Sequence, residues 1–287
     1  MVRTINDLYL STRRALRGAG VEGAELEAKL LLCHALSCTK EELLARMQMY
    51  AGESAQAALS AMTERRLQGE PVAYITGMWE FCGLPMEVSP AVLIPRSDTE
   101  VLVEEALRLL HAEHKADARI LDLGCGSGCI GIALGHFLPG SRLTAVDVSP
   151  EAVEITKRNI RRNGLVRRSA VLEGNILEPP PMRMGEYDLL VSNPPYIRSD
   201  EIETLDVSVK DYEPRLALDG GEDGLKFYRS ILSRWLSVLS DSGSVIMEIG
   251  EGQSEDVQEL MRSAGLHEVR SAPDNYGTER IVIGSKK

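Results

Sequence analysis

The chain has 287 residues, of which 44% are hydrophobic, so it can bury a sizeable core and is long enough for two domains. A formal net charge of -11 argues against a surface that grips a long nucleic acid. No apolar run approaches the ~20 residues that cross a bilayer, and Asn6 and Asp7 interrupt the N-terminal stretch where a signal peptide needs unbroken apolar sequence. We therefore expect a cytoplasmic protein that contacts neither a membrane nor nucleic acid directly.

The cysteines and histidines do not indicate a metal site. The five cysteines, among them Cys33 with Cys38 and Cys125 with Cys129, match no zinc-binding spacing, and their number is odd. The five histidines are scattered, and none stands at ligand spacing from a cysteine or a carboxylate. The sequence therefore predicts reduced thiols in or near the core and no bound metal.

Residues 1–72 repeat apolar side chains at the spacing of amphipathic helices. Helical stretches begin near Ile5, Ala24 and Ser54, and the last of them ends near Gly69. Thr39 is followed three residues later by Glu42, which is a capping-box pattern at the start of another helix. We predict a helical bundle, which serves either as a packing module or as a domain that recognises a protein substrate.

The pattern changes at Glu70 and Pro71. The next stretch alternates apolar and polar residues between glycine and proline breaks, which predicts a β-hairpin linker over residues 73–95. Over residues 96–287, strands alternate with helices, a pattern typical of a mostly parallel sheet with helices on both faces. Within this domain we expect one long helix from Leu225 to Leu239 and then a strand from Ser244 to Ile249.

A glycine-rich loop follows the first strand of this domain. In "ILDLGCGSGCIG", Gly124, Gly126 and Gly128 lie between a strand and a helix, where backbone without a Cβ can approach a ligand closely. Asp147 ends the next strand, and a carboxylate there can accept both ribose hydroxyls of an adenosine ligand. Because Gly126, Gly128 and Gly131 also fit the dinucleotide fingerprint, the loop alone leaves both a nicotinamide cofactor and S-adenosylmethionine open.

The stretch "LLVSNPPYIRS" ends a predicted buried strand with Asn193, Pro194, Pro195 and Tyr196. Two prolines block helix growth and leave the Pro194 carbonyl free, while the Asn193 side chain supplies a second oxygen acceptor. Two fixed acceptors suit an amide or amino NH₂ group, and they stabilise the charge that develops on nitrogen during methyl transfer more than they stabilise the ground state. If the first and fourth strands are neighbours, the turn lies beside the glycine loop and predicts N-methylation, with Asn193, Pro194 and Tyr196 as its catalytic groups.

Several segments resemble the HemK/PrmC family, the peptide chain release factor glutamine N5-methyltransferases. The resemblance implies a seven-stranded, Rossmann-like methyltransferase domain with an N-terminal helical bundle and a hairpin linker. It also implies transfer of a methyl group from S-adenosyl-L-methionine to the glutamine of the Gly-Gly-Gln (GGQ) motif of release factors, which leaves S-adenosyl-L-homocysteine. We expect a monomer. The segments are GEPVAYITGMWEF, LIPRSDTE, ILDLGCGSGCIGIAL, AVDVS, VSNPPYI, YEPRLALDGGEDGL and DNYGTER.

The family's functional residues can be carried over by position. Residues 96–100 would close over the cofactor side of the site, and Ile176 or Leu177 takes the place of the aromatic residue that commonly covers the adenine. We interpret residues 213–215 (Glu-Pro-Arg) as structural, bracing the Asn-Pro-Pro-Tyr turn. The implied cofactor-binding residues are Gly124, Cys125, Gly126, Ser127, Gly128, Asp147, Asn175, Ile176 and Asn193, and the implied substrate-binding residues are Asn193, Pro194, Pro195 and Tyr196.

Three alternatives remain open at this point. The same chemistry could act on the glutamine of ribosomal protein L3, or on a DNA adenine. The acidic charge and the lack of an evident basic recognition domain disfavour DNA. A third possibility is a module that binds S-adenosylmethionine without catalysis, although an intact Asn193 argues against it.

Overall fold

The computed structural model describes residues 3–182 and 184–287, and the chain divides into two compact units. The first unit comprises the N-terminal part of the chain up to Met78, together with the segment Val207–Tyr212. The second unit comprises Trp79–Asp206 and Glu213–Lys287. The division thus falls inside the stretch that the sequence indicates as a linker.

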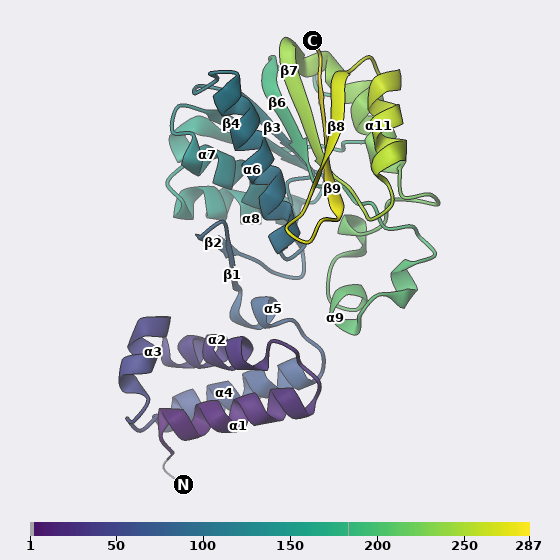
Figure 1. The fold of residues 1–287 in the computed structure, drawn as a ribbon. Coiled ribbons are helices and arrows are strands. Elements are labelled where there is room, and N and C mark those ends of the chain that lie inside the picture. The colour runs from purple at the N-terminus through teal and green to yellow at the C-terminus, as the bar shows by residue number, and fades with distance from the viewer. Residues whose placement is uncertain (1–2, 183) are drawn as a thin grey trace. The chain divides into compact units, whose positions relative to one another are not determined.

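The first unit is a bundle of helices, shown in purple and blue in Figure 1. The predicted capping box at Thr39 and Glu42 is present, and a second one joins Thr4 to Asp7 at the start of the first helix. Leu31 is among several leucines that are fully buried between these helices. The helices are α1 (Ile5–Gly18), α2 (Ala24–Leu36), α3 (Lys40–Arg46), α4 (Glu53–Leu67) and α5 (Val72–Thr76).

A distant segment completes this unit at the end of α4. It contains the short helix α9 (Val207–Lys210), and the Tyr212 hydroxyl donates a hydrogen bond to the carbonyl oxygen of Gln68 at 3.0 Å. Gly69 has a φ of +101°, and a Cβ there would lie 3.3 Å from the Val207 side chain. A glycine is therefore required both for the left-handed backbone that ends α4 and for the close approach of the inserted segment.

The predicted hairpin is present but shorter than expected. It consists of β1 (Met78–Phe81) and β2 (Leu84–Glu87), and Cys82 and Gly83 between them both have positive φ, as the two-residue turn of a tight hairpin requires. Residues 73–76, assigned to the hairpin linker from the sequence, instead belong to the helix α5 (Val72–Thr76), which follows Pro71 and is capped by Gly77 in the left-handed region. That part of the prediction was wrong because Tyr, Ile and Thr favour strands only where a neighbouring strand is available.

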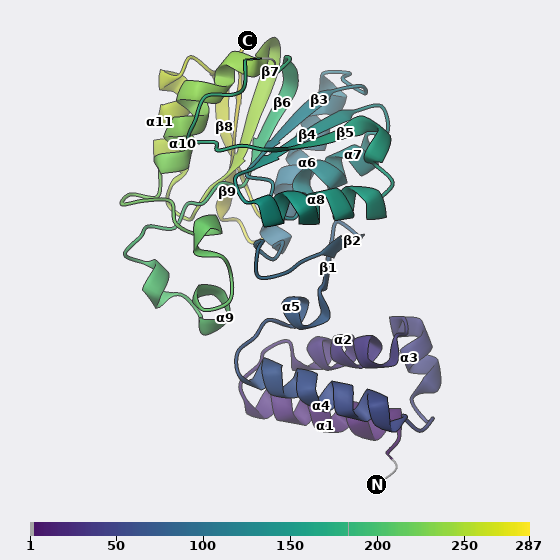
Figure 2. The same ribbon diagram turned by 180° about the vertical axis from the view of Figure 1, so that it is seen from behind.

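The second unit contains the predicted seven-stranded sheet, which is mostly parallel (Figure 2). Its order is β5-β4-β3-β6-β7-β9-β8, and only the last strand pairs, β7 with β9 and β9 with β8, are antiparallel. The first strand of the domain therefore does lie beside the fourth, with β4 on its other side. The strands are β3 (Arg119–Leu123), β4 (Arg142–Asp147), β5 (Ser169–Glu173), β6 (Tyr187–Ser192), β7 (Leu239–Glu248), β8 (His267–Pro273) and β9 (Glu279–Ser285).

Helices cover both faces of this sheet. Alternate residues of the buried strands serve opposite cores: Ile120 packs with α6, α7 and α8 on one face, while Leu121 packs with Trp235 and α11 on the other. Parallel strands buried on both faces explain the nearly continuous apolar runs in their sequences. The covering helices are α6 (Ser97–Ala112), α7 (Cys129–Phe137), α8 (Pro150–Arg162), α10 (Lys226–Ser230) and α11 (Ser254–Ser263).

The helix predicted from residue 225 to 239 is present from Lys226 to Val238, but its hydrogen bonding changes along its length. α10 ends at Ser230, a π-helical turn covers Ile231–Trp235 and a 3-10 turn covers Leu236–Val238. β7 then begins at Leu239, five residues before the predicted strand. The Ser230 hydroxyl and the Trp235 indole N–H both donate to the carbonyl oxygen of Ile176, so distant backbone sets the helix geometry here. Leu239 then pairs with β6. Within the described residues, helices long and apolar enough to cross a bilayer are absent.

Candidate active site

A cleft of about 850 Å³ opens at the carboxyl ends of β3, β4 and β6, within the second unit. Strand order reverses here, because β4 follows β3 on one side and β6 lies on the other, and ligands of open α/β sheets bind at such a point. Most of the residues predicted from the sequence to bind a cofactor line this cleft. They are Gly124, Cys125, Gly126, Ser127, Asp147, Asn175, Ile176 and Asn193.

The glycine loop uses left-handed backbone conformations, which residues with a Cβ adopt only with strain. Gly124, Gly126 and Gly128 all have positive φ, at 69°, 55° and 80°. A Cβ at Gly126 would meet no atom within 4 Å, so this part of the loop faces open space in the cleft. A Cβ at Gly128 would lie 2.7 Å from the Thr156 side chain, so this glycine lets the loop pack on α8. The loop is thus a cradle whose open side a ligand can approach closely.

Asp147 holds the loop and retains free acceptor capacity. Its Oδ2 accepts the Gly126 N–H at 2.8 Å, and its Oδ1 accepts the Ser149 N–H at 2.9 Å. Burial raises the pKa of the Asp147 carboxyl, and nearby backbone N–H groups, first those of Ser149 and Gly126, oppose that rise. An ionised carboxylate has about four acceptor sites, so two backbone bonds leave room for a pair of ligand hydroxyls. These free acceptor sites fit the two ribose hydroxyls of an adenosine cofactor.

The adenine-covering position also has a suitable side chain. Ile176 is buried and Leu177 half-buried, and both line the cleft beside Asn175. The carbonyl of Ile176 is fixed by the two hydrogen bonds from Ser230 and Trp235. Either aliphatic side chain can therefore present a fixed apolar surface to a planar base.

The Asn-Pro-Pro-Tyr turn follows β6 and lies between two hollows. Asn193 and Pro195 line the main cleft, and Pro194 is buried. Tyr196 instead lines a second cavity of about 550 Å³, whose other residues include Trp79. Pro95 and Arg96 line both hollows. The other residues that line the second cavity are Trp79, Glu80, Phe81, Ile94, Ser97, Asp98, Glu100 and Arg280.

Asn193 has a defined orientation. Its side-chain Nδ2 donates to the Thr99 hydroxyl at 3.2 Å, which leaves Oδ1 to accept from a ligand. Thr99 is the third residue of α6, whose N-cap is Arg96. Of residues 96–100, Arg96 and Thr99 line the main cleft. Ser97, Asp98 and Glu100 line the second cavity, which Arg96 also borders.

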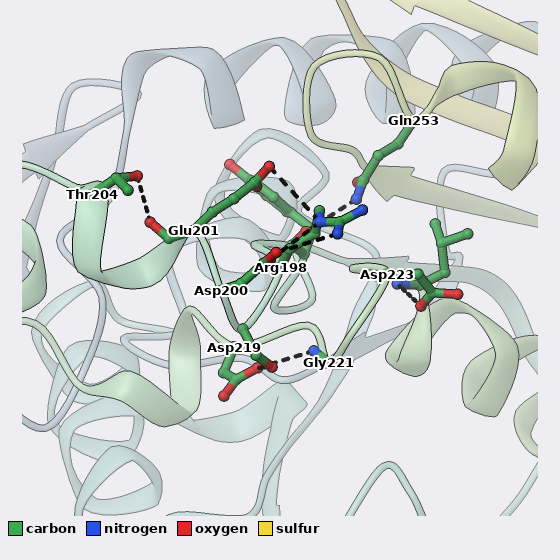
Figure 3. Close-up of polar contacts among 11 residues, drawn as sticks. Arg198, Asp200, Glu201, Thr204, Asp219, Gly221, Asp223 and Gln253 are labelled. Carbon is green, nitrogen blue, oxygen red and sulfur yellow. Dashed lines mark hydrogen bonds and ion pairs between the residues drawn. The ribbon is translucent and has the colours of Figure 1, made fainter.

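The loop after the turn is braced by a segment rich in glycine, seen in Figure 3. Ile197 forms an isolated parallel bridge with Asp219, and the Ser199 N–H donates to the Gly221 carbonyl at 3.0 Å. Gln253 Nε2 donates to the Tyr196 carbonyl oxygen at 3.0 Å, as the dashed line at Gln253 indicates. Asp219 itself accepts from the Gly221 N–H at 3.0 Å. The backbone after the turn is therefore fixed on both sides.

Glu213 does not brace this turn, contrary to the interpretation from the sequence. It is buried, accepts the Ile94 N–H at 3.2 Å and forms a short ion pair with Arg96. Burial raises the pKa of the Glu213 carboxyl, and the Arg96 guanidinium opposes that rise. Glu213 therefore holds the segment that separates the two hollows, while Arg215 pairs with Glu203 at the surface.

Glu248, an acidic residue at the end of β7, also belongs to the site and was not predicted from the sequence. Its side chain is 2% exposed, and its carboxyl lies near Thr99, Asn193 and Tyr196. The available signal was a single acid at the end of the apolar run "SVIME", on the edge of the sheet where ligands bind. Among the described residues, clusters of three or more His, Cys, Asp or Glu that could hold a metal ion are absent.

Two family models match the chain. The model described as the PrmC N-terminal domain matches residues 7–77. The model described as the methyltransferase small domain matches residues 99–210. Among solved structures, a methyltransferase from Pyrococcus furiosus is similar, with a TM-score of 0.52 at 20% identity over 79% of this chain and 98% of that chain. At that identity the likeness shows the fold alone.

The sheet order and the matching domain define a methyltransferase of the Rossmann-like class. Two relatives, both called release factor glutamine methyltransferase, are similar over nearly the whole chain. The one from Geobacter sulfurreducens is 42% identical over 98% of this chain and 96% of its own length. The one from Moorella thermoacetica is 40% identical over 96% of this chain and 95% of its own length. The chain belongs to the release factor glutamine methyltransferase family, which confirms the family and fold class predicted from the sequence.

Proposed function

We propose that the chain methylates the side-chain amide nitrogen (N5) of the glutamine in the Gly-Gly-Gln motif of a peptide chain release factor. Membership of the family supports this substrate class. The observation that carries the chemistry is the orientation of Asn193, whose Nδ2 is engaged by Thr99 so that Oδ1 is left to accept. Such a partner would locate the reaction in the cytoplasm, and we expect the enzyme to act as a monomer.

The cofactor proposed is S-adenosyl-L-methionine, which supplies an electrophilic methyl group on a sulfonium when bound. Gly124 to Gly128 would take the part of the ligand that approaches the loop backbone, and Asp147 would accept the ribose hydroxyls. Asn175 with Ile176 or Leu177 would cover the adenine. The cleft of about 850 Å³ is within the size range of small-molecule sites, which supports this assignment.

The chain's own groups would act on the substrate nitrogen by hydrogen bonding. The glutamine amide would donate its two N–H bonds to Asn193 Oδ1 and to the Pro194 carbonyl oxygen. As this nitrogen would bond to the methyl carbon, the bond from that carbon to sulfur would break and leave a neutral thioether, and the N–H bonds would become more positive. The two acceptors would stabilise this state more than the ground state, and one N–H proton would then pass to solvent. Tyr196 and Pro195 are proposed as contacts for the glutamine side chain, and the second cavity beside Tyr196 offers the substrate a separate approach.

The direct test is incubation of the full chain with S-adenosylmethionine and an unmodified release factor, followed by peptide mass spectrometry. We expect one methyl group on the Gly-Gly-Gln glutamine and none on a release factor in which that glutamine is replaced by glutamate. Ribosomal protein L3 and duplex DNA serve as competing acceptors. Methylation of either of these in preference to the release factor would contradict the proposed substrate, and binding of the cofactor without any transfer would indicate a sensor.

Replacing Asp147 with alanine should weaken binding of S-adenosylmethionine by roughly 10- to 100-fold, because hydrogen bonds to a charged group contribute about 1.5–3 kcal/mol and each 1.4 kcal/mol is tenfold in affinity. Titration calorimetry measures this change. Glu173→Ala is the matched control, since Glu173 is opposite Asp147 on the neighbouring strand but is exposed. Equal affinities for Asp147→Ala and wild type would rule out the ribose contact.

A further inference from the structure

Glu248 is a buried carboxyl group that the proposed chemistry does not yet use. It ends β7, directly beside β6, where Met247 pairs with Ser192. Its side chain is 2% exposed, and its Oε2 has no hydrogen-bond partner among the described residues. A buried acid without full hydrogen bonding is destabilising, so its presence at this edge of the sheet calls for a functional explanation.

The neighbours of Glu248 are the residues that orient the substrate acceptor. Thr99, itself 2% exposed, accepts from Asn193 Nδ2 at 3.2 Å. The Thr99 hydroxyl and the Asn193 amide both lie close enough to the Glu248 carboxyl to favour its ionised form. The Tyr196 hydroxyl is 3.5 Å from Glu248 Oε1, which is too long for a strong hydrogen bond. Three groups of the site thus converge on one carboxyl.

We propose that Glu248 is a positioning residue that fixes the direction of the Asn193 amide, chiefly through the Thr99 hydroxyl; the catalytic part of this inference depends on the function proposed above. An amide side chain can present either its oxygen or its NH₂ to a ligand, but methyl transfer to nitrogen requires the oxygen. An ionised carboxylate can only accept, so in the arrangement we propose the nearby Thr99 hydroxyl turns its hydrogen toward Glu248. Thr99 Oγ1 is then available to Asn193 only as an acceptor, which turns the NH₂ of Asn193 inward and Oδ1 toward the substrate.

Protonation of Glu248 would remove this constraint. A neutral carboxyl can donate to Thr99, which can then donate to Asn193 Oδ1 and compete with the substrate. Burial raises the pKa of Glu248 to about 7, and Asp98 adds to the rise while Thr99, Arg280 and Asn193 oppose it. The Tyr196 and Tyr228 hydroxyls are the other titratable groups that face Glu248, and burial raises the pKa of each. The orientation of Asn193 should therefore be fixed above pH 7 and lost as the pH falls below it.

The first test observes Asn193 directly and does not depend on any methyl acceptor. In protein labelled with ¹⁵N-asparagine, the Asn193 side-chain NH₂ signals are assigned by their disappearance in Asn193→Ala. We expect these signals to shift with a midpoint near 7 in the wild type, and to lose that titration in Glu248→Gln and in Thr99→Val. The inference would be overturned if these signals shifted neither with pH nor in Glu248→Gln.

The second test measures methyl transfer between about pH 6 and pH 9. The wild-type kcat should rise through pH 7, whereas Glu248→Gln should give a flat profile with kcat lowered roughly 10- to 100-fold, the range typical of losing an outer partner of a functional group. The KM for S-adenosylmethionine should stay unchanged. Thr99→Val should behave in the same way, and Glu105→Gln, a buried acid of α6 that pairs with Arg108 and Arg270, should keep the wild-type profile.

Stability separates positioning from a structural role. Because burial raises the pKa of Glu248, the folded state is less stable when the carboxyl is ionised, so Glu248→Gln should melt no lower than the wild type at about pH 8. A folded Glu248→Gln with wild-type kcat and a wild-type pH profile would refute positioning. A different outcome is a wild type whose Asn193 signals titrate with pH but which transfers no methyl group to a release factor. That outcome would refute the proposed substrate and would still support the positioning of Asn193.

Discussion

Replacement of Asn193 by alanine should lower kcat for methyl transfer by roughly 100- to 1,000-fold, the effect typical of removing one fixed polar group that stabilises developing charge. The side chain donates to Thr99 and offers its oxygen at the carboxyl edge of β6, beside the glycine loop of β3. Its loss removes an acceptor for the N–H bonds of the reacting nitrogen, so we expect a larger effect on kcat than on cofactor affinity. Single-turnover kinetics with a release factor and calorimetry with S-adenosylmethionine measure the two effects separately.

Asn163→Ala is a suitable control for that experiment. Asn163 also donates through Nδ2, to the Pro85 carbonyl at 3.1 Å, but it lies at the end of α8 and outside the cleft. It should retain nearly wild-type kcat. The mechanism would be wrong if Asn193→Ala were folded, bound the cofactor and transferred methyl groups as fast as Asn163→Ala.

Replacement of Gly224 by alanine should disable the site from a distance. Its φ is +75°, and a Cβ there would lie 2.5 Å from both the Tyr196 carbonyl oxygen and Gln253 Nε2. Overpacking of this kind costs roughly 1–3 kcal/mol, and the left-handed backbone adds about 1 kcal/mol for a residue with a side chain. Because the clash is with Tyr196 itself, the turn must shift, and a displacement of about 1 Å can lower the rate ~100-fold.

Urea unfolding and kcat measurements on Gly224→Ala test this expectation. Gly252→Ala is the matched control, since Gly252 has a similar φ of +81° but a Cβ there would meet no atom within 4 Å. Gly252→Ala should have a lower free energy of unfolding because of the left-handed backbone, but its kcat should stay close to that of the wild type. Equal rates for the two variants would mean that the contact with Tyr196 does not set the geometry of the turn.

The parts of the structure that could be predicted from the sequence depend on local signals. The capping box at Thr39 and the glycine that ends α4 each act within one helical turn, and the corresponding helices were predicted within a residue or two. The sequence analysis made the meeting of Asn193 with the glycine loop conditional on the first and fourth strands being neighbours, and the pairing of β3 with β6 meets that condition.

The parts that could not be predicted depend on contacts between distant residues. The carbonyl of Ile176 receives two hydrogen bonds that reshape the chain after α10, and nothing near Trp235 in the sequence indicates this. The brace of the turn is an isolated bridge between Ile197 and Asp219, outside every regular strand. The place of Glu248 in the site could be inferred only once its strand, β7, was known to lie next to β6.

The insertion of Val207–Tyr212 into the first unit has a consequence for dissecting the protein. No single cut of the polypeptide releases that unit whole, because part of it is encoded in the middle of the other. A fragment ending at Met78 would keep α1 to α5 but would leave the Gln68 carbonyl without the Tyr212 hydroxyl and the surface at Gly69 uncovered. Studies of the bundle in isolation therefore need the missing hexapeptide supplied, either as a synthetic peptide or through a grafted connection after Met78.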